Sequence, residues 1–117
     1  MRKGAGIAVV LAALCCSAAP PAEGAQAQVR HCRPVLDPYP NTRYEGADLT
    51  RIRATGVKCR RARRVVRRAH YEALGLPPPL TGVRRFDWHG WRVRGDLRGD
   101  SDRYVARRDG KVVRWRF

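Results

Sequence analysis

The stretch KCRRARRVVRRAH (58–70) constrains the fold most strongly, because its apolar residues recur every three or four positions. A helix with this spacing gathers small and apolar residues on one face, namely Cys59, Ala62, Val65, Val66, Ala69 and Ala73. Six arginines fall on the opposite arc, namely Arg60, Arg61, Arg63, Arg64, Arg67 and Arg68. Gly75 and the prolines at 77–79 end such a helix. The sequence predicts a helix over 57–74 whose small buried face suits packing on a sheet.

After the proline run the period changes to two, which indicates strands. Residues 111–117 alternate apolar and basic side chains, and residues 102–108 place Tyr104 and Ala106 on one face. A weaker alternation over 48–55 predicts a short strand. Asp109 and Gly110 lie between the two C-terminal strands, and both residue types tolerate the positive φ of a tight hairpin turn. We therefore expect an antiparallel hairpin over 102–117.

Within residues 83–95, Phe86 and Trp88 stand at even positions before His89 and Gly90, whereas Trp91 and Val93 stand at odd positions after them. Such a switch marks either a β-bulge or a tight turn. We expect a bulge in one long strand, followed by a loop over 96–102. The predicted class is α+β, with one helix on a three- or four-stranded antiparallel meander over 83–117.

Prolines 34, 38 and 40 predict an extended arm over 28–47. Cys32 lies in this arm and Cys59 at the start of the predicted helix, and a disulfide between them would tie the two together. It would close a loop of about 28 residues, worth roughly 3–4 kcal/mol on the chain-entropy model. Two unpaired or intermolecular thiols are the alternative.

Residues 1–27 have the pattern of an export signal. Arg2 and Lys3 precede a short apolar segment, and Ala25 and Ala27 provide the small residues that signal peptidase accepts. The alternative is a lipoprotein acylated at Cys15 or Cys16, although neither cysteine follows the small residue that such signals prefer. Cleavage after Ala27 would leave 28–117 as a single exported domain without a transmembrane segment.

The net charge is +15, and loss of Arg2, Lys3 and Glu23 would reduce it only to +14. Such a charge attracts polyanions, and strand arginines extend the positive field, namely Arg84, Arg85, Arg92, Arg94, Arg107, Arg108, Arg114 and Arg116. Trp88 and Trp91 could stack on nucleic-acid bases, but no nucleic-acid motif is present and export removes the chain from the chromosome. A GC-rich genome would also enrich arginine.

Catalytic and metal-binding patterns are weak. Residues 28–117 contain three histidines, His31, His70 and His89, and one serine, without a hydrolase motif. His70 is expected at the boundary of the helix's apolar face, and His89 in the bulge or turn. Aspartates 96, 100 and 102 share one loop but lack the glutamate of a calcium loop. We expect no enzyme activity, no metal and no cofactor.

The segments IRATGVKCRRARRVV (52–66), HGWRVR and YVARRDGKVVRWRF resemble small exported bacterial proteins of no established function. In that pattern a Gly-Val-x-Cys segment opens the helix, as Gly56, Val57 and Cys59 do here. A second cysteine pair normally joins two later strands, and Val93 and Ala106 stand at those positions. The resemblance implies that these strands pair, and it implies no activity.

The sequence thus predicts a non-catalytic exported protein that binds an anionic surface or polymer of the cell envelope or environment. The six arginines of the helix are the candidate binding face. Insertion of this helix into a membrane is less favoured, because its apolar face carries only small side chains. The alternative function is a protein-binding or inhibitor-like module whose charge is incidental. The stiff segment 75–82 could then present a ligand surface, although a rigid connector explains it as well.

Overall fold

The computed structural model describes residues 4, 6 and 28–117. The predicted export signal, its cleavage site and the lipoprotein cysteines Cys15 and Cys16 lie outside the described residues. The fold and the candidate site therefore belong to 28–117, and the export of the chain stays a prediction.

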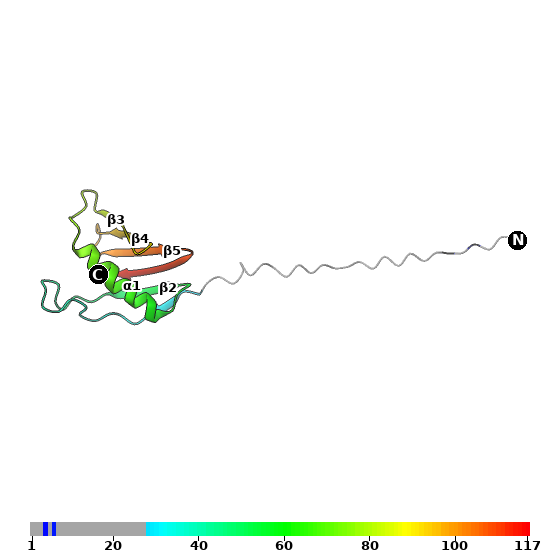
Figure 1. The fold of residues 1–117 in the computed structure, drawn as a ribbon, viewed down its shortest axis with the longest axis horizontal. Helices are drawn as coiled ribbons and strands as arrows, with labels where there is room; N and C mark the ends of the chain where they lie inside the picture. The colour runs from blue at the N-terminus through cyan, green and yellow to red at the C-terminus, as the bar shows by residue number, and fades with distance from the viewer. Residues whose placement is uncertain (1–3, 5, 7–27) are drawn as a thin grey trace.

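The described residues form one helix and six strands (Figure 1). Their bounds are β1 Arg30–Cys32, β2 Thr50–Thr55, α1 Cys59–Leu74, β3 Val83–Trp88, β4 Trp91–Asp96, β5 Arg103–Arg108 and β6 Lys111–Arg116. The strands make one antiparallel sheet in the order β1-β2-β6-β5-β4-β3, and α1 lies across one of its faces. The α+β class is confirmed, but the sheet has six strands rather than three or four.

One additional strand arises at His89 and Gly90, where the predicted bulge is wrong. The two residues form a tight turn, with φ of 45° and 80°, so that Trp88 pairs with Trp91. The residues that flank a two-residue turn face the same side of the sheet, which explains the switch of parity in the sequence. Asp109 and Gly110, with φ of 47° and 77°, form the predicted turn between β5 and β6.

The helix begins at Cys59, two residues after the predicted start, and ends at Leu74 as predicted. Lys58 is its N-cap and makes no side-chain capping bond. The disulfide between Cys32 and Cys59 is present and joins β1 to the first turn of α1, with 5.3 Å between the Cα atoms. The predicted arm is thus tied to the helix, and its first part adds the short strand β1 to the sheet.

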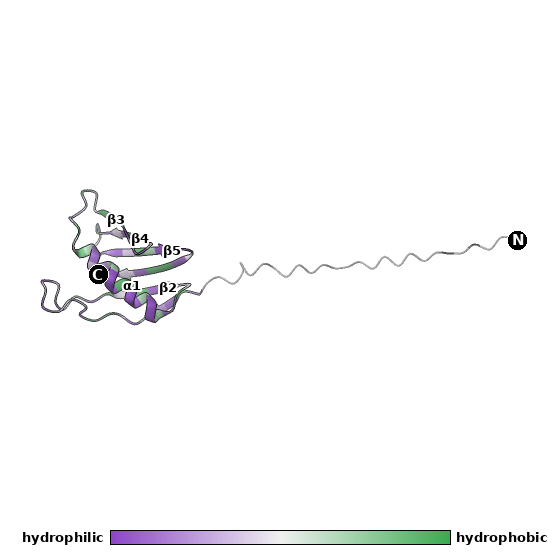
Figure 2. Ribbon diagram, viewed as in Figure 1, coloured by the Kyte–Doolittle hydropathy of each residue, from purple (hydrophilic) through white to green (hydrophobic). Residues whose placement is uncertain are grey.

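The core lies between α1 and the sheet. A row of paired residues crosses the sheet under the helix, namely Ala54, Val113, Ala106, Val93 and Phe86. The pairing of Val93 with Ala106 places β4 beside β5, as the sequence pattern implied. Figure 2 shows hydrophobic and hydrophilic residues alternating along the strands. This alternation is expected because one face of the sheet packs on α1, whereas no described helix covers the other face.

His70 is fully buried rather than at the boundary of the helix face. Trp115 donates a hydrogen bond from Nε1 to His70 Nδ1 at 3.1 Å, and the rings of Tyr104 and Phe117 pack 4.8 and 4.2 Å from the imidazole. This bond requires a lone pair on Nδ1, so the imidazole is neutral. Burial, and next the charge of Arg84, lower the pKa of His70 from 6.5 to about 3.

Arg84 is also buried, with 9 % of its surface exposed. It is therefore not one of the surface arginines, contrary to the expectation from the sequence. Its guanidinium donates hydrogen bonds to the carbonyls of Ala73, Leu76 and Pro77. Carbonyl groups at the end of a helix lack intrahelical partners and carry partial negative charge, and a cation satisfies both needs. Arg84 therefore caps the C-terminus of α1 from strand β3.

Candidate functional site

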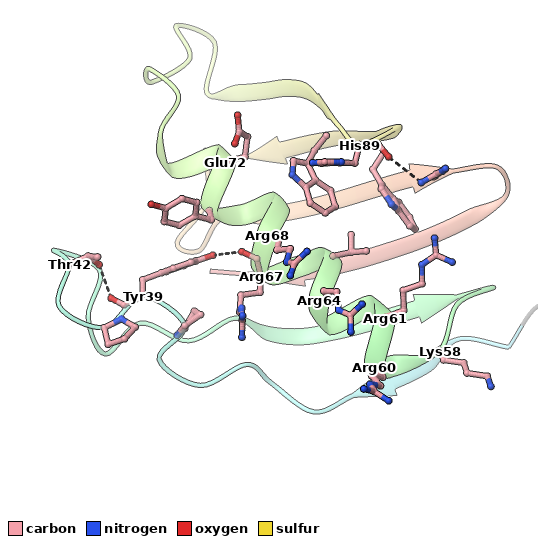
Figure 3. A pocket seen from close by; sticks show the side chains of 17 residues that line it. Tyr39, Thr42, Lys58, Arg60, Arg61, Arg64, Arg67, Arg68, Glu72 and His89 are labelled. Carbon is pink, nitrogen blue, oxygen red and sulfur yellow. Dashed lines mark hydrogen bonds between the residues drawn. The ribbon is translucent and has the colours of Figure 1, made fainter.

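An open groove of about 940 Å³ runs over the solvent side of α1 (Figure 3). Five of the six predicted arginines line it, namely Arg60, Arg61, Arg64, Arg67 and Arg68. They recur every three or four residues, so they form a track along the helix axis. Lys58 extends the track at the N-terminal end of α1, and Arg108 approaches from β5. We call this surface the helix groove.

The sixth arginine, Arg63, has a different position. Its Nε donates to the carbonyl of Arg33 at 3.1 Å, and its terminal nitrogen donates to the carbonyl of Pro34 at 3.2 Å. Both acceptors belong to the N-terminal arm. Arg63 therefore holds the arm against the helix, and the structure does not bring it together with the other five.

The β3–β4 hairpin forms one wall of the helix groove. Trp88 is half-buried and Trp91 is buried, and the imidazole of His89 packs edge-on against Trp88 at 4.5 Å between ring centroids. Arg108 donates a hydrogen bond to the backbone carbonyl of His89 at 3.1 Å, which fixes the turn beside the groove. The wall thus offers aromatic surface next to a row of cations.

The arm and the second half of α1 form the other end of the groove. The Tyr39 hydroxyl donates to the carbonyl of Arg67 at 3.0 Å, and its ring lies 5.8 Å from that of Tyr71, which is 65 % exposed. Burial raises the pKa of Tyr39, only partly offset by the nearby Arg67, so the hydroxyl keeps its proton. The segment around Tyr39 is therefore anchored to the helix and shapes the groove.

The helix groove is strongly positive. Glu72 is its only acidic residue, against five arginines of α1, Lys58 and Arg108. The two ion pairs found among the described residues are Arg98 with Asp96 and Arg108 with Asp109. None of the five helix arginines takes part in them, so their guanidinium groups are available to an anion.

The other described residues whose side chains could act in catalysis or bind a metal do not cluster. Within the described residues no three His, Cys, Asp or Glu side chains gather in a way that could hold a metal. Asp96 binds Arg98 through both carboxylate oxygens at 3.0 Å, and these hydrogen bonds lower the pKa of Asp96. No helix of the described part is long and apolar enough to cross a membrane.

A second cationic surface covers the face of the sheet opposite α1. Nine arginines project from it, namely Arg51, Arg53, Arg85, Arg92, Arg94, Arg103, Arg107, Arg114 and Arg116. Asp87 and Asp96 share this face. We call it the open sheet face. From the sequence, most of these arginines are predicted only to contribute to a general positive field, although the alternation of each strand indicates that they share a face.

Comparison of the chain with family models, curated proteins and solved structures found no match. Fold and surface therefore define its class. It is an α+β domain with a disulfide-tied arm, one helix on a six-stranded antiparallel sheet, and arginine-rich surfaces on both sides.

Proposed function

We propose that the protein is a non-catalytic binding protein for an anionic polymer of the cell envelope or its surroundings, and that the helix groove is the binding surface. The observation that carries the proposal is the track of five arginines without ion-pair partners in one open groove. From Arg60 to Arg68 the track covers about 12 Å of the helix axis. A linear polymer with repeated negative charges can occupy such a track along its length, whereas a small ion contacts only part of it.

Guanidinium groups favour phosphate, sulfate and carboxylate groups because their planar N–H donors bind two oxygens at once. The aromatic wall with Trp88 adds a surface that can pack on the apolar parts of an organic polyanion such as heparin, whereas polyphosphate would bind through its charges alone. Export through residues 1–27 belongs to the proposal, and the disulfide between Cys32 and Cys59 is compatible with an oxidising compartment.

The test replaces four arginines of the groove, R60Q, R64Q, R67Q and R68Q, and compares this variant with R85Q, R92Q, R94Q and R107Q on the open sheet face. Both variants lose four charges, so a general charge effect weakens both equally. We expect the groove variant to bind long-chain polyphosphate and heparin at least tenfold more weakly than the sheet variant. The plot of log K against log salt concentration should also become less steep for the groove variant. Equal losses would exclude the helix groove as the site.

The alternative of a protein-binding module rests on the connector 75–82, in which Leu80 is fully exposed. Single exposed leucines are common on protein surfaces and do not mark a binding site by themselves. The connector is also held by Arg84 through the carbonyls of Leu76 and Pro77, as expected of a rigid link between helix and sheet. We therefore favour the anionic polymer.

A further inference from the structure

Five arginines surround a small recess of about 160 Å³ at one end of the open sheet face. They come from three adjacent strands, namely Arg51 and Arg53 from β2, Arg114 and Arg116 from β6, and Arg103 from β5. We call this group the sheet cluster. It lies on the opposite side of the sheet from the helix groove, because the residues that alternate with it, such as Ala54 and Val113, are buried under α1.

The register of the sheet sets like charges directly opposite one another in this cluster. Arg53 pairs with Arg114, and Arg103 pairs with Arg116. Side chains at directly paired positions start only about 5 Å apart, and like charges there are unfavourable. The arrangement therefore raises the free energy of the folded protein unless an anion lies between the guanidinium groups.

The acidic residue paired with the cluster across the sheet does not relieve this repulsion. Asp96 is paired with Arg103 across β4 and β5, but its carboxylate is bound by Arg98. No member of the sheet cluster belongs to an ion pair within the described residues. The pKa of Arg116 is lowered, first by the charge of Arg51, then by loss of hydration and by Arg103 and Arg53. The guanidinium groups are thus close enough to repel one another.

Arg51 has a backbone conformation that disfavours its residue type. Its φ is 50°, and it lies where the register between β2 and β6 shifts by one residue. Glycine is preferred at such a bulge position, and other residues there carry conformational strain. The other described non-glycine residues with positive φ are Asp, Asn and His, and two of these lie in hairpin turns. A strained arginine beside four others has no evident structural benefit.

We propose that the sheet cluster binds one tetrahedral oxyanion, a phosphate or sulfate group, in the recess between β2, β6 and β5. The recess has roughly five times the volume that one water molecule occupies in the liquid, about 30 Å³. It therefore accommodates such a group with a few waters. Guanidinium donors on three strands surround it, which suits the several oxygens of a tetrahedral anion. This site is separate from the helix groove and does not depend on the proposed function.

The first experiment titrates the full chain with inorganic phosphate at constant ionic strength, followed by amide NMR shifts and calorimetry. We expect saturable binding of one phosphate, with the largest shifts in β2, β5 and β6. The variant with R53Q, R103Q and R116Q should bind at least tenfold more weakly. The matched variant with R85Q, R92Q and R107Q loses the same charge at residues outside both the sheet cluster and the helix groove, and should bind phosphate as the unmodified protein does. Equal weakening in both, or shifts without saturation, would overturn the site.

A second variant, R51G, keeps the proposal testable if the triple variant is poorly folded. Glycine relieves both the backbone strain and part of the repulsion, so the melting temperature of R51G should rise while its phosphate affinity falls several-fold. A purely structural role for Arg51 would instead lower the melting temperature. Unchanged phosphate affinity in R51G would remove Arg51 from the site and overturn the proposed geometry.

The source of the anion is distinguished by comparing inorganic phosphate, inorganic sulfate and glycerol phosphate. Tighter binding of the glycerol ester identifies a phosphate group carried on a larger molecule, whereas equal or tighter binding of the inorganic ions identifies a free ion. Failure of this site and failure of the helix groove are separate outcomes, because the first is read from phosphate binding by the sheet-cluster variants and the second from polyphosphate binding by the groove variants.

Discussion

Two polar residues, His70 and Arg84, are buried in this small domain. Arg84 forms hydrogen bonds there with backbone carbonyls, and His70 forms one with an aromatic side chain. Arg84 bonds three carbonyls at the end of α1, and His70 accepts the indole N–H of Trp115. Neither role is visible in the local sequence, where His70 lies beside the predicted apolar face and Arg84 stands in a run of strand arginines. Long-range partners decide whether such a side chain is buried.

The buried imidazole makes stability depend on pH. In the unfolded chain His70 takes up a proton below its ordinary pKa of 6.5, whereas in the folded protein it stays neutral down to about pH 3. The unfolded state therefore binds more protons in this interval, and stability falls as pH falls. The slope approaches about 1.4 kcal/mol per pH unit from this residue. Urea unfolding at pH 7, 5 and 4 measures it.

The matched control is H70N, which keeps an acceptor near Nδ1 for Trp115 and does not titrate in this range. H70N should be less stable than the unmodified protein at pH 7, and the difference should shrink as pH falls. A constant difference between the two proteins from pH 7 to pH 4 would contradict a buried neutral imidazole.

At the scale of elements, the sequence predicted the helix and the turn whose structure depends on residues close together in the chain. The helix over 57–74 follows from a spacing of three and four, and the turn at Asp109 and Gly110 from two residues that tolerate positive φ. At His89 and Gly90 the switch of parity is compatible with a bulge as well as with a turn, so the sequence alone does not distinguish the two between β3 and β4. The three-residue strand β1 depends on pairing with β2, which its own sequence does not indicate.

The candidate site was also predicted only in part from the sequence. The arginines of α1 were predicted because helical periodicity places them on one arc, but the walls of the helix groove come from the arm and from a distant hairpin. The sheet cluster depends on the pairing of β2 with β6, strands separated by the helix and three other strands. Sequence alternation shows which face a strand residue occupies, and only the register shows which arginines are neighbours.

The link between arm and helix gives a prediction at this scale. Reduction of the Cys32–Cys59 disulfide frees a loop of about 28 residues in the unfolded chain and should lower the free energy of unfolding by about 3–4 kcal/mol. A small domain has only about 5–15 kcal/mol in total, so the guanidinium midpoint should shift markedly. The measurement is guanidinium unfolding with and without a reductant.

The control for this measurement is the double variant C32S and C59S, which should be as unstable as the reduced protein and insensitive to the reductant. Arg63 still holds the arm through the carbonyls of Arg33 and Pro34 in both forms. An unchanged midpoint on reduction would show that these backbone contacts alone fix the arm.

At the scale of the whole molecule, the charge is distributed over both sides of the fold. The helix groove carries five arginines of α1 and the open sheet face carries nine arginines, and none of these takes part in the two ion pairs of the described part. A high net charge of one sign keeps a protein soluble but destabilises its compact state through repulsion. An anionic polymer in the groove and an oxyanion in the sheet cluster would each relieve part of that repulsion.

This distribution makes stability depend on salt. The screening length falls from about 30 Å at 0.01 M to about 8 Å at 0.15 M, so salt weakens repulsion between arginines on the same face. The melting temperature should therefore rise as sodium chloride increases over this range, and calorimetry or circular dichroism measures the rise. The variant with R85Q, R92Q, R94Q and R107Q lacks four of these charges and should show a smaller rise from a higher starting value.

At equal ionic strength, phosphate should raise the melting temperature further than chloride, because it occupies the sheet cluster as well as screening the charge. A melting temperature that is independent of salt in the unmodified protein would mean that the arginines do not repel one another appreciably, and the sheet cluster would then have no repulsion for an anion to relieve.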